Sequence, residues 1–355
     1  MRRLLIASFL LLPLAAAAQS TTTIDDLKTP PSPAFVLMGI APSAVQEPTT
    51  PKALGASLLS AVDDSNASAT PRNFALEFAP YWMTNHPDLT YDKFNEADFG
   101  QALLQSLSVS LATTQQTAAT STTPASTLGG LGIRASWLIG KPSAVEGQIR
   151  DAIKQATTTA AVNMGAPVPG ATAAPLISSN TNLTNLIESL RSARYEGRWY
   201  VEAAAATTAL FSGNDADHSA HQKNGFWLTP SYRLSRTTFN ATTGTSSSQP
   251  NIDLLGVVRW ISDHTGTTIS QPLDLGARLI WNSGSVSVSA EHLQRRHTSN
   301  NSSRTAAIGN FKINDNLYVT ATFGKNFADE TPNGNLIGIL GLHFGIGSQP
   351  LSLTQ

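Results

Sequence analysis

The sequence predicts an all-β fold, a transmembrane antiparallel β-barrel of about twelve strands, with roughly ten to fourteen possible. Three observations predict it. Apolar and polar residues alternate along a series of segments between residues 73 and 347. Most segments are about nine to thirteen residues long, whereas soluble strands are usually five or six and membrane-crossing strands nine to eleven. Aromatic residues fall at segment ends, where the aromatic girdles of such barrels lie: Trp82, Trp137, Trp199, Trp260, Trp281 and Phe344.

Residues 1–18 have the pattern of a signal peptide. Arg2 and Arg3 precede an unbroken apolar run, and three small residues, Ala16 to Ala18, supply a cleavage site before Gln19. The sequence therefore predicts export. Without a later apolar helix, an exported chain is secreted, periplasmic or inserted in an outer membrane as a barrel.

The next segment, residues 19–72, is rich in Pro, Ser, Thr and Asp and contains one apolar patch, AFVLMGI (35–41). A helix is expected from Thr50, in TPKALGASLLSAV. The segment is predicted to be either periplasmic or a plug inside the barrel.

The predicted barrel spans residues 73–347. The stretch LDLGARLIWNSGSVSVSAEH (273–292) is typical of it, because two alternating runs are joined by the turn residues Asn-Ser-Gly. With the apolar side facing lipid, the polar side lines a wet lumen. The charged residues predicted to line that lumen are Glu77, Arg134, Arg198, Glu202, Arg233, Asp253, Arg259, Asp274, Arg278, Glu291, Arg295 and Lys312. They either set the selectivity of an open pore or pair across a closed interior.

Residues 141–196 interrupt the alternation and are predicted to form a helical insertion. A capping box, Ser143 to Glu146, begins one helix, and TNLTNLIESLRSA carries leucines on one face of another. We expect the insertion to pack on the barrel rim, with a lumen plug or gate as the alternative. Residues 348–355 form a C-terminal tail.

The connections predict an orientation and a strand missing from the series. The shortest ones, NSG (282–284) and ND (314–315), are expected to be periplasmic, so that the last strand ends there too. The alternating segments recognised in the sequence number eleven. With an odd number, the first strand would start on the outer side of the membrane, which an exported chain can hardly do. AFVLMGI is the preferred twelfth strand, and a strand within 237–251 is the other candidate.

The chain resembles Gram-negative outer-membrane β-barrel proteins. The likeness rests on the predicted export signal, the long alternating strands and the glycine-interrupted last strand NLIGILGLHFGIG, and it is to a class rather than to one functional family. It implies location in the cell outer membrane. One departure is that Phe344 is followed by GIGSQPLSLTQ, whereas such chains usually end on an aromatic residue.

The composition of the chain limits the kinds of molecule that it is expected to bind. The net charge is −1 and only 13% of residues are charged, so that no basic excess indicates nucleic acid. The chain has no cysteine, which excludes thiolate chemistry. Outer-membrane lipid is the expected partner, with small solutes or an envelope complex possible. No cofactor or metal is predicted, although His218 and His221, near Asp215 and Asp217, could in principle ligate a cation.

One stretch suggests chemistry. HTSNNSSR (297–304) resembles outer-membrane phospholipase A, which implies His297 as the base, Ser299 as the nucleophile and Asn310 as an orienting amide. A Ser/Asn-rich hairpin loop is the preferred interpretation of the same residues. Three functions are thus carried forward: a non-enzymatic outer-membrane pore, transporter or scaffold, which is preferred; a barrel-borne lipid hydrolase; and a secreted soluble β-rich adhesin.

Overall fold

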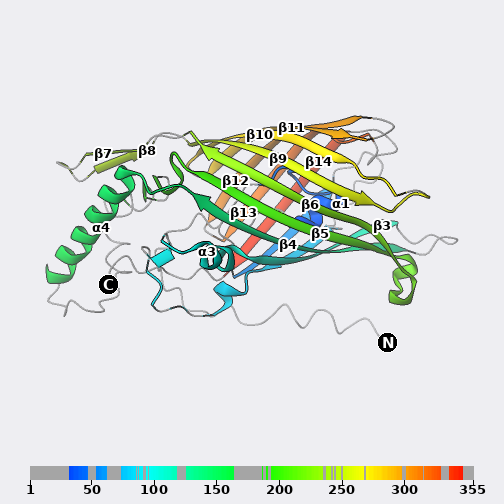
Figure 1. Cartoon of the computed structure of the whole chain (residues 1–355), viewed down its shortest axis with the longest axis horizontal. Helices are drawn as coiled ribbons and strands as arrows, with labels where there is room; N and C mark the ends of the chain where they lie inside the picture. Colours follow the sequence, from blue (N-terminus) through cyan, green and yellow to red (C-terminus); the bar gives the residue numbers. More distant parts are fainter. Residues whose placement is uncertain are drawn as a thin grey trace.

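The computed structural model describes residues 32–346, apart from 47–52, 62–72, 118–124, 164–185, 298–300, 329–335 and scattered single residues and pairs between them. Twelve antiparallel strands pair in sequence order, and β1 pairs with β14 to close the barrel (Figure 1). The predicted fold class is confirmed. The strands are β1 (Leu54–Ala61), β2 (Asn73–Phe78), β3 (Ser108–Thr117), β4 (Ser126–Ile139), β5 (Trp199–Phe211), β6 (Ser219–Arg233), β9 (Asn251–Asp263), β10 (Leu273–Ser283), β11 (Val286–Arg296), β12 (Ser302–Asn314), β13 (Leu317–Lys325) and β14 (Leu336–Ile346).

The twelfth strand is not where the sequence predicts it. β1 lies in the segment expected to be helical from Thr50, and the barrel therefore begins before residue 73. The preferred candidate, AFVLMGI, contributes instead to helix α1 (Pro33–Met38). Residues 237–251, the other candidate, hold a separate two-stranded sheet, β7 (Thr237–Asn240) and β8 (Thr245–Ser248).

The helical expectation failed at β1 because both faces of this strand carry leucine. Leu58 points outward, whereas Leu59 is fully buried in the lumen. A strand with two apolar faces loses its period-2 pattern, and its leucines then match a helical spacing equally well.

The barrel has two distinguishable ends. The tight turns after β10 and β12 lie at one end, where β1 also begins and β14 ends; this is called the short-turn end. The same end carries the long connections β2–β3 and β4–β5, whereas the loop after β11 lies at the opposite end.

Inward and outward residues alternate as the pattern predicts. Along β11 every second residue is buried, so that Glu291 and Arg295 face the lumen and Val288 and Ala290 face out. Of the predicted girdle aromatics, Trp199, Trp260 and Trp281 are exposed on the exterior. Trp82 is not: it follows β2 in a short 3-10 helix, η2 (Tyr81–Met83), and is buried with its indole N–H donating to the Gln105 carbonyl at 2.6 Å.

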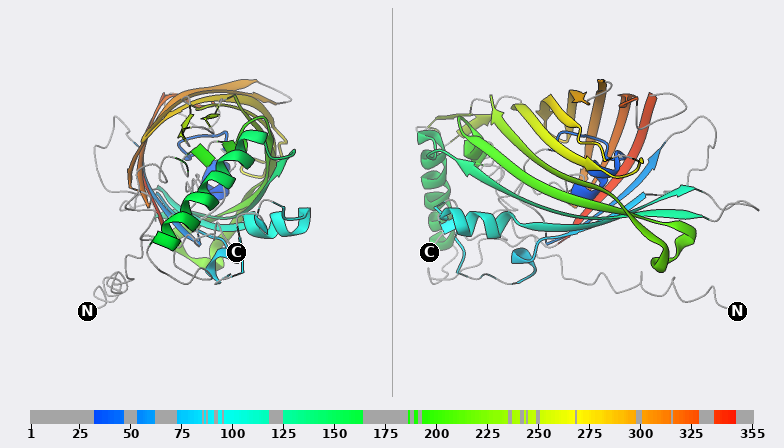
Figure 2. Two further views of the ribbon diagram at one scale, coloured as in Figure 1. Left: turned by 90° about the vertical axis from the view of Figure 1, so that its left-hand side faces the viewer. Right: turned by 45° about the vertical axis from the view of Figure 1, so that its right-hand side comes forward.

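Residues 32–46, called the plug below, lie inside the ring of strands (Figure 2, left). They consist of α1 and an extended continuation, and most of their side chains are buried. The plug's apolar residues pack in one cluster with inward-facing residues of the wall, among them Leu59, Trp227, Leu255 and Ile280. Of the two places predicted for the N-terminal segment, this part occupies the lumen.

Helical segments gather at the short-turn end. Helix α4 (Ala144–Asn163) lies beyond the strand ends, and its Ile149 and Ile153 pack with Leu186, Leu190 and Trp82. Figures 1 and 2 both place α4 at this end of the barrel. Helix α4, the described helix of the insertion, thus lies at the barrel rim. Helix α3 (Phe99–Ser106) packs on β4 through Phe99 and Trp137. Among the described residues, no helix is both long and apolar enough to cross a membrane.

Candidate functional site

The plug is held to the wall by a buried carboxylate. Glu291 of β11 accepts hydrogen bonds from the Ser43 hydroxyl at 2.7 Å and from the backbone N–H groups of Ala44 and Val45 at 3.1 and 3.3 Å. Because these three donors are consecutive in the chain, the carboxylate holds one short extended segment in a defined register. Hydrogen bonds to a charged acceptor are among the stronger ones in proteins.

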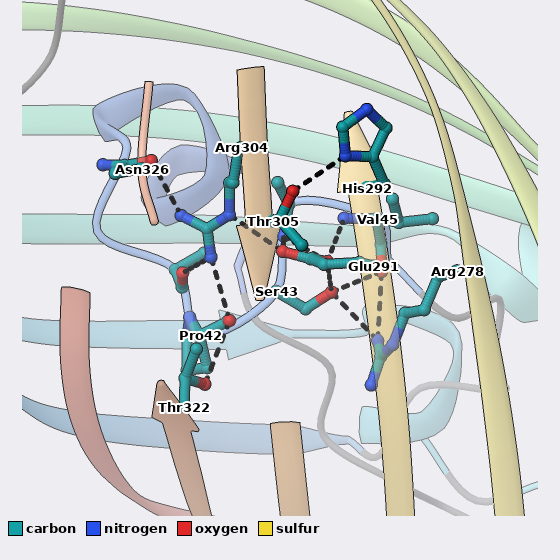
Figure 3. Close-up of polar contacts among 12 residues, drawn as sticks. Pro42, Ser43, Val45, Arg278, Glu291, His292, Arg304, Thr305, Thr322 and Asn326 are labelled. Carbon is teal, nitrogen blue, oxygen red and sulfur yellow. Dashed lines mark hydrogen bonds and ion pairs between the residues drawn. The ribbon is translucent and has the colours of Figure 1, made fainter. Parts of the chain in front are cut away.

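Two arginines complete this contact from the neighbouring strands (Figure 3). Arg278 of β10 donates to the Ser43 hydroxyl and the Val45 carbonyl, at 3.0 and 3.1 Å. Arg304 of β12 donates to Glu291 at 2.8 Å and to the Pro42 carbonyl at 3.0 Å. The plug carries no charge between Ser32 and Gln46, so that its backbone carbonyls and amides satisfy the charged wall. We name Arg278, Glu291 and Arg304 the latch.

On its other side, the plug packs closely against glycines of the wall. A Cβ added at Gly132 would come within 2.7 Å of Pro33 Cβ and 3.0 Å of the Ala34 backbone nitrogen. One added at Gly130 would lie 3.0 Å from Ala34 Cβ, and one at Gly225 would lie 2.7 Å from Leu37. These glycines leave room for α1 against β4 and β6, where a bulky side chain would displace it.

Two clusters of charged side chains lie in the lumen, one nearer the short-turn end and one towards the opposite end. Nearer the short-turn end, Arg134 donates to Glu77 at 2.7 Å and to Glu202 at 2.9 Å. Towards the opposite end, Asp274 accepts from Arg259 at 2.6 Å and from Arg295 at 2.7 Å. The Arg295 guanidinium also lies 3.9 Å from the Phe327 ring centroid. All of these side chains are buried, and pairing offsets the cost of removing their charges from water.

The other predicted lumen residues lie at the short-turn end. Arg233 and Asp253 form a two-bond pair at 2.7 and 2.9 Å. Arg198 precedes β5 and lies 3.6 Å from Glu146 of α4, so that it joins the rim to the barrel. Lys312 follows the inward positions of β12 but is exposed near the end of the strand.

Sequence reasoning missed two components of this site. Arg304 was placed in the loop 297–304, whereas β12 already begins at Ser302 and directs Arg304 inward. The apolar inward residues Trp227, Leu255, Val257 and Ile280 were not assigned a role. They offered a usable signal, because apolar side chains at lumen positions predict that something apolar fills the lumen.

The structure separates two of the three residues of the hydrolase alternative, His297 and Asn310. Ser299 lies outside the described residues. His297 follows β11 at the opposite end, whereas Asn310 pairs with Ser287 near the short-turn end. From Ser302 to Asn310 the strand advances about 26 Å at about 3.3 Å per residue. Asn310 is already bonded to Ser287 and Thr320 within the lumen, so that it cannot orient His297.

The two candidate histidines lie on different elements: His218 is in the loop between β5 and β6, whereas His221 is in β6, where its ring packs edge-on against His264. His218 lies 2.8 Å from Asp215, and His221 lies 3.0 Å from Asn224. The Asp217 backbone N–H and the His218 ring hold the pKa of the exposed Asp215 carboxyl below its usual range. In the part of the chain that the structure describes, no three His, Cys, Asp or Glu residues gather in a possible metal site.

The exterior of the barrel is apolar. Outward positions on successive strands expose large hydrophobic side chains, among them Leu131, Phe226, Val258, Leu279 and Phe323, each at least 45% accessible. Soluble monomers rarely expose a continuous apolar surface of this kind, whereas a lipid-facing barrel requires one. The chain is a transmembrane β-barrel.

Comparison with known proteins gives likenesses of form only. No protein-family model and no curated protein matches the sequence. Among solved structures, the transport unit of the autotransporter AIDA-I from Escherichia coli is 10% identical, with coverage of 82% of this chain and 89% of that one and a TM-score of 0.25. The translocator domain of the autotransporter NalP from Neisseria meningitidis is 7% identical, with 82% and 86% covered and a TM-score of 0.26. A Rhodopseudomonas blastica porin is 9% identical, with 82% and 98% covered and a TM-score of 0.23.

Proposed function

We propose that the protein is an outer-membrane channel for small hydrophilic solutes that is closed at rest by residues 32–46 and opens when this plug is displaced. The observation that carries the proposal is the latch. The plug is uncharged, whereas the wall it touches carries Arg278, Glu291 and Arg304. If the plug were a permanent part of the barrel interior, well-packed apolar residues in place of the latch would stabilise it as well or better.

The contacts of the plug also suit release. Its polar bonds to the described wall include those with three neighbouring strands, β10 to β12, and those with Thr322 of β13 and Trp227 of β6. On β4, Gly130 and Gly132 lie against α1, and they supply no side chain to hold it. Loss of the latch would therefore leave the plug held mainly by its apolar contacts, and its release would not break the barrel's own strand pairing.

Weakening the latch tests this proposal. We expect Glu291→Gln to raise the ratio of open to closed channel by roughly tenfold to a hundredfold, since one hydrogen bond to a charged group is worth about 1.5–3 kcal/mol. Single-channel recording in planar bilayers measures this ratio, using protein that passes a heat-modifiable gel-shift test for folding. The open ratio is compared rather than the single-channel conductance, because Glu291→Gln also removes a charge from the wall of the open lumen.

The matched control is Asp217→Asn, which alters an exposed carboxylate in the loop between β5 and β6. It should leave the opening frequency unchanged. An open ratio that is the same in Glu291→Gln, the control and the wild type would contradict gating through the latch.

A further inference from the structure

We infer that the channel, once the plug has left, selects small anions. The inference rests on the proposed function and names the class of solute. It comes from which wall groups the plug covers. Arg278 and Arg304 together donate three hydrogen bonds to the plug carbonyls of Val45, Ala41 and Pro42, with donor–acceptor distances of 3.1, 3.3 and 3.0 Å.

Carbonyl oxygens are acceptors, and in this site they occupy positions that anionic oxygens or a halide can take. Guanidinium groups bind carboxylate and phosphate oxygens with the same donors that here bind the plug. When the plug is displaced, these donors face water and passing solutes. The resting structure thus holds the arginines in place with a neutral acceptor of their own chain.

The charge of this wall has a definite sign. On β9 to β12 at the level of the plug and just beyond it towards the opposite end, the described inward residues include four arginines and two carboxylates, an excess of two positive charges. These residues are Arg259, Asp274, Arg278, Glu291, Arg295 and Arg304. Two further charged pairs join β6 to β9, Arg233 with Asp253 and Lys223 with Asp263, and each is neutral as a pair.

One group in the lumen has the opposite sign. Arg134 with Glu77 and Glu202 leaves one negative charge in excess, across the barrel and nearer the short-turn end. Both carboxylates are bonded to Arg134. The net positive charge of the wall on β9 to β12 is therefore larger than the net negative charge of this cluster. This wall is also the part of the lumen that displacement of the plug uncovers. Rings of basic side chains favour anions in pores.

The experiment measures reversal potentials in planar bilayers under a KCl gradient, with a folded variant lacking residues 32–46. We expect the reversal potential to lie between zero and the equilibrium potential of chloride, as it does for a pore that prefers chloride to potassium. In this background, Arg278→Gln with Arg304→Gln should move the potential towards zero or past it, whereas Glu291→Gln should move it further towards chloride. The matched control is Arg296→Gln, next to Arg295 on β11 but facing outward, which should leave the potential unchanged.

The outcomes separate the two proposals. A folded plug-deleted barrel that carries no current contradicts the proposed channel function, and the inference falls with it. A current that is unselective or prefers potassium leaves the channel standing and overturns the inference. A chloride preference that is indifferent to Arg278, Arg304 and Glu291 also overturns it, since the selectivity would then arise elsewhere. If deletion prevents folding, the latch variant Glu291→Gln in the full chain supplies the openings on which the same potential is measured.

Discussion

Deletion of residues 32–46 is expected to turn a closed barrel into a steadily conducting one. The plug accounts for the apolar cluster at the centre of the lumen, where Phe35, Val36 and Leu37 pack against wall residues. Without it, Trp227, Leu255 and Ile280 would line a water-filled space beside the latch. Planar-bilayer recording of folded protein measures the difference, with the full-length chain closed for most of the time and the deleted chain open.

A peptide of the deleted sequence provides the control for this experiment. Added to the deleted barrel, SPAFVLMGIAPSAVQ should close it in a concentration-dependent manner, because Glu291 and the arginines recognise backbone groups and the Ser43 hydroxyl. A peptide in the same composition but scrambled order should not. Persistent closure of the deleted barrel without peptide would show that other lumen groups block the pore.

Replacement of Asp274 by alanine should destabilise the barrel by about 3–5 kcal/mol, the cost typical of removing one partner from a buried ion pair. The Asp274 side chain is fully buried and accepts from both Arg259 and Arg295. Its loss leaves two guanidinium groups facing each other without a counter-charge. Urea unfolding of the reconstituted barrel, followed by tryptophan fluorescence, measures the change.

Two further variants make this result interpretable. Asp215→Ala removes an exposed carboxylate from a loop and should leave the unfolding midpoint unchanged. Asp274→Ala combined with Arg259→Ala should recover part of the loss, because one unpaired charge is then removed. If Asp274→Ala unfolded at the wild-type urea concentration, the buried charge cluster would not be holding the barrel interior together.

The alternation in the sequence was enough to predict the barrel and the inward direction of Glu77, Arg134, Asp274 and Glu291. It works because a strand between lipid and lumen has two chemically different sides, and the side-chain period is two. The pairing of the charges was one of two open alternatives. Their actual partners, such as Asp274 with Arg259 and Arg295, depend on strand register across the barrel, which alternation alone does not encode.

The plug was harder to predict for a physical reason. AFVLMGI is apolar on every side, and such a segment can be a buried strand or a buried helix. Here it is surrounded by wall on all sides, so that neither periodicity appears. The prediction of a helix in place of β1 was wrong for a related reason, because Leu59 faces the plug rather than water. Both errors arise from one missing fact, that the lumen is filled by the chain's own N-terminal segment.

A cysteine cross-link between the plug and the wall tests this central claim most directly. The chain has no cysteine, so that Ala34→Cys with Gly130→Cys introduces the only pair. Ala34 Cβ lies 3.0 Å from a Cβ built at Gly130, and a small shift reaches the roughly 3.5–4.5 Å of a disulfide. The control pairs Ala34→Cys with Gly309→Cys, on an outward position of β12 where an added Cβ meets nothing within 4 Å.

The measurement is the gel mobility of each folded, membrane-inserted variant after mild oxidation, with and without reductant. We expect a reducible internal cross-link for the Ala34/Gly130 pair and none for the Ala34/Gly309 pair. Equal failure of both pairs to cross-link, with all thiols open to a water-soluble alkylating reagent, would place the segment outside the lumen and contradict a lumen filled by residues 32–46.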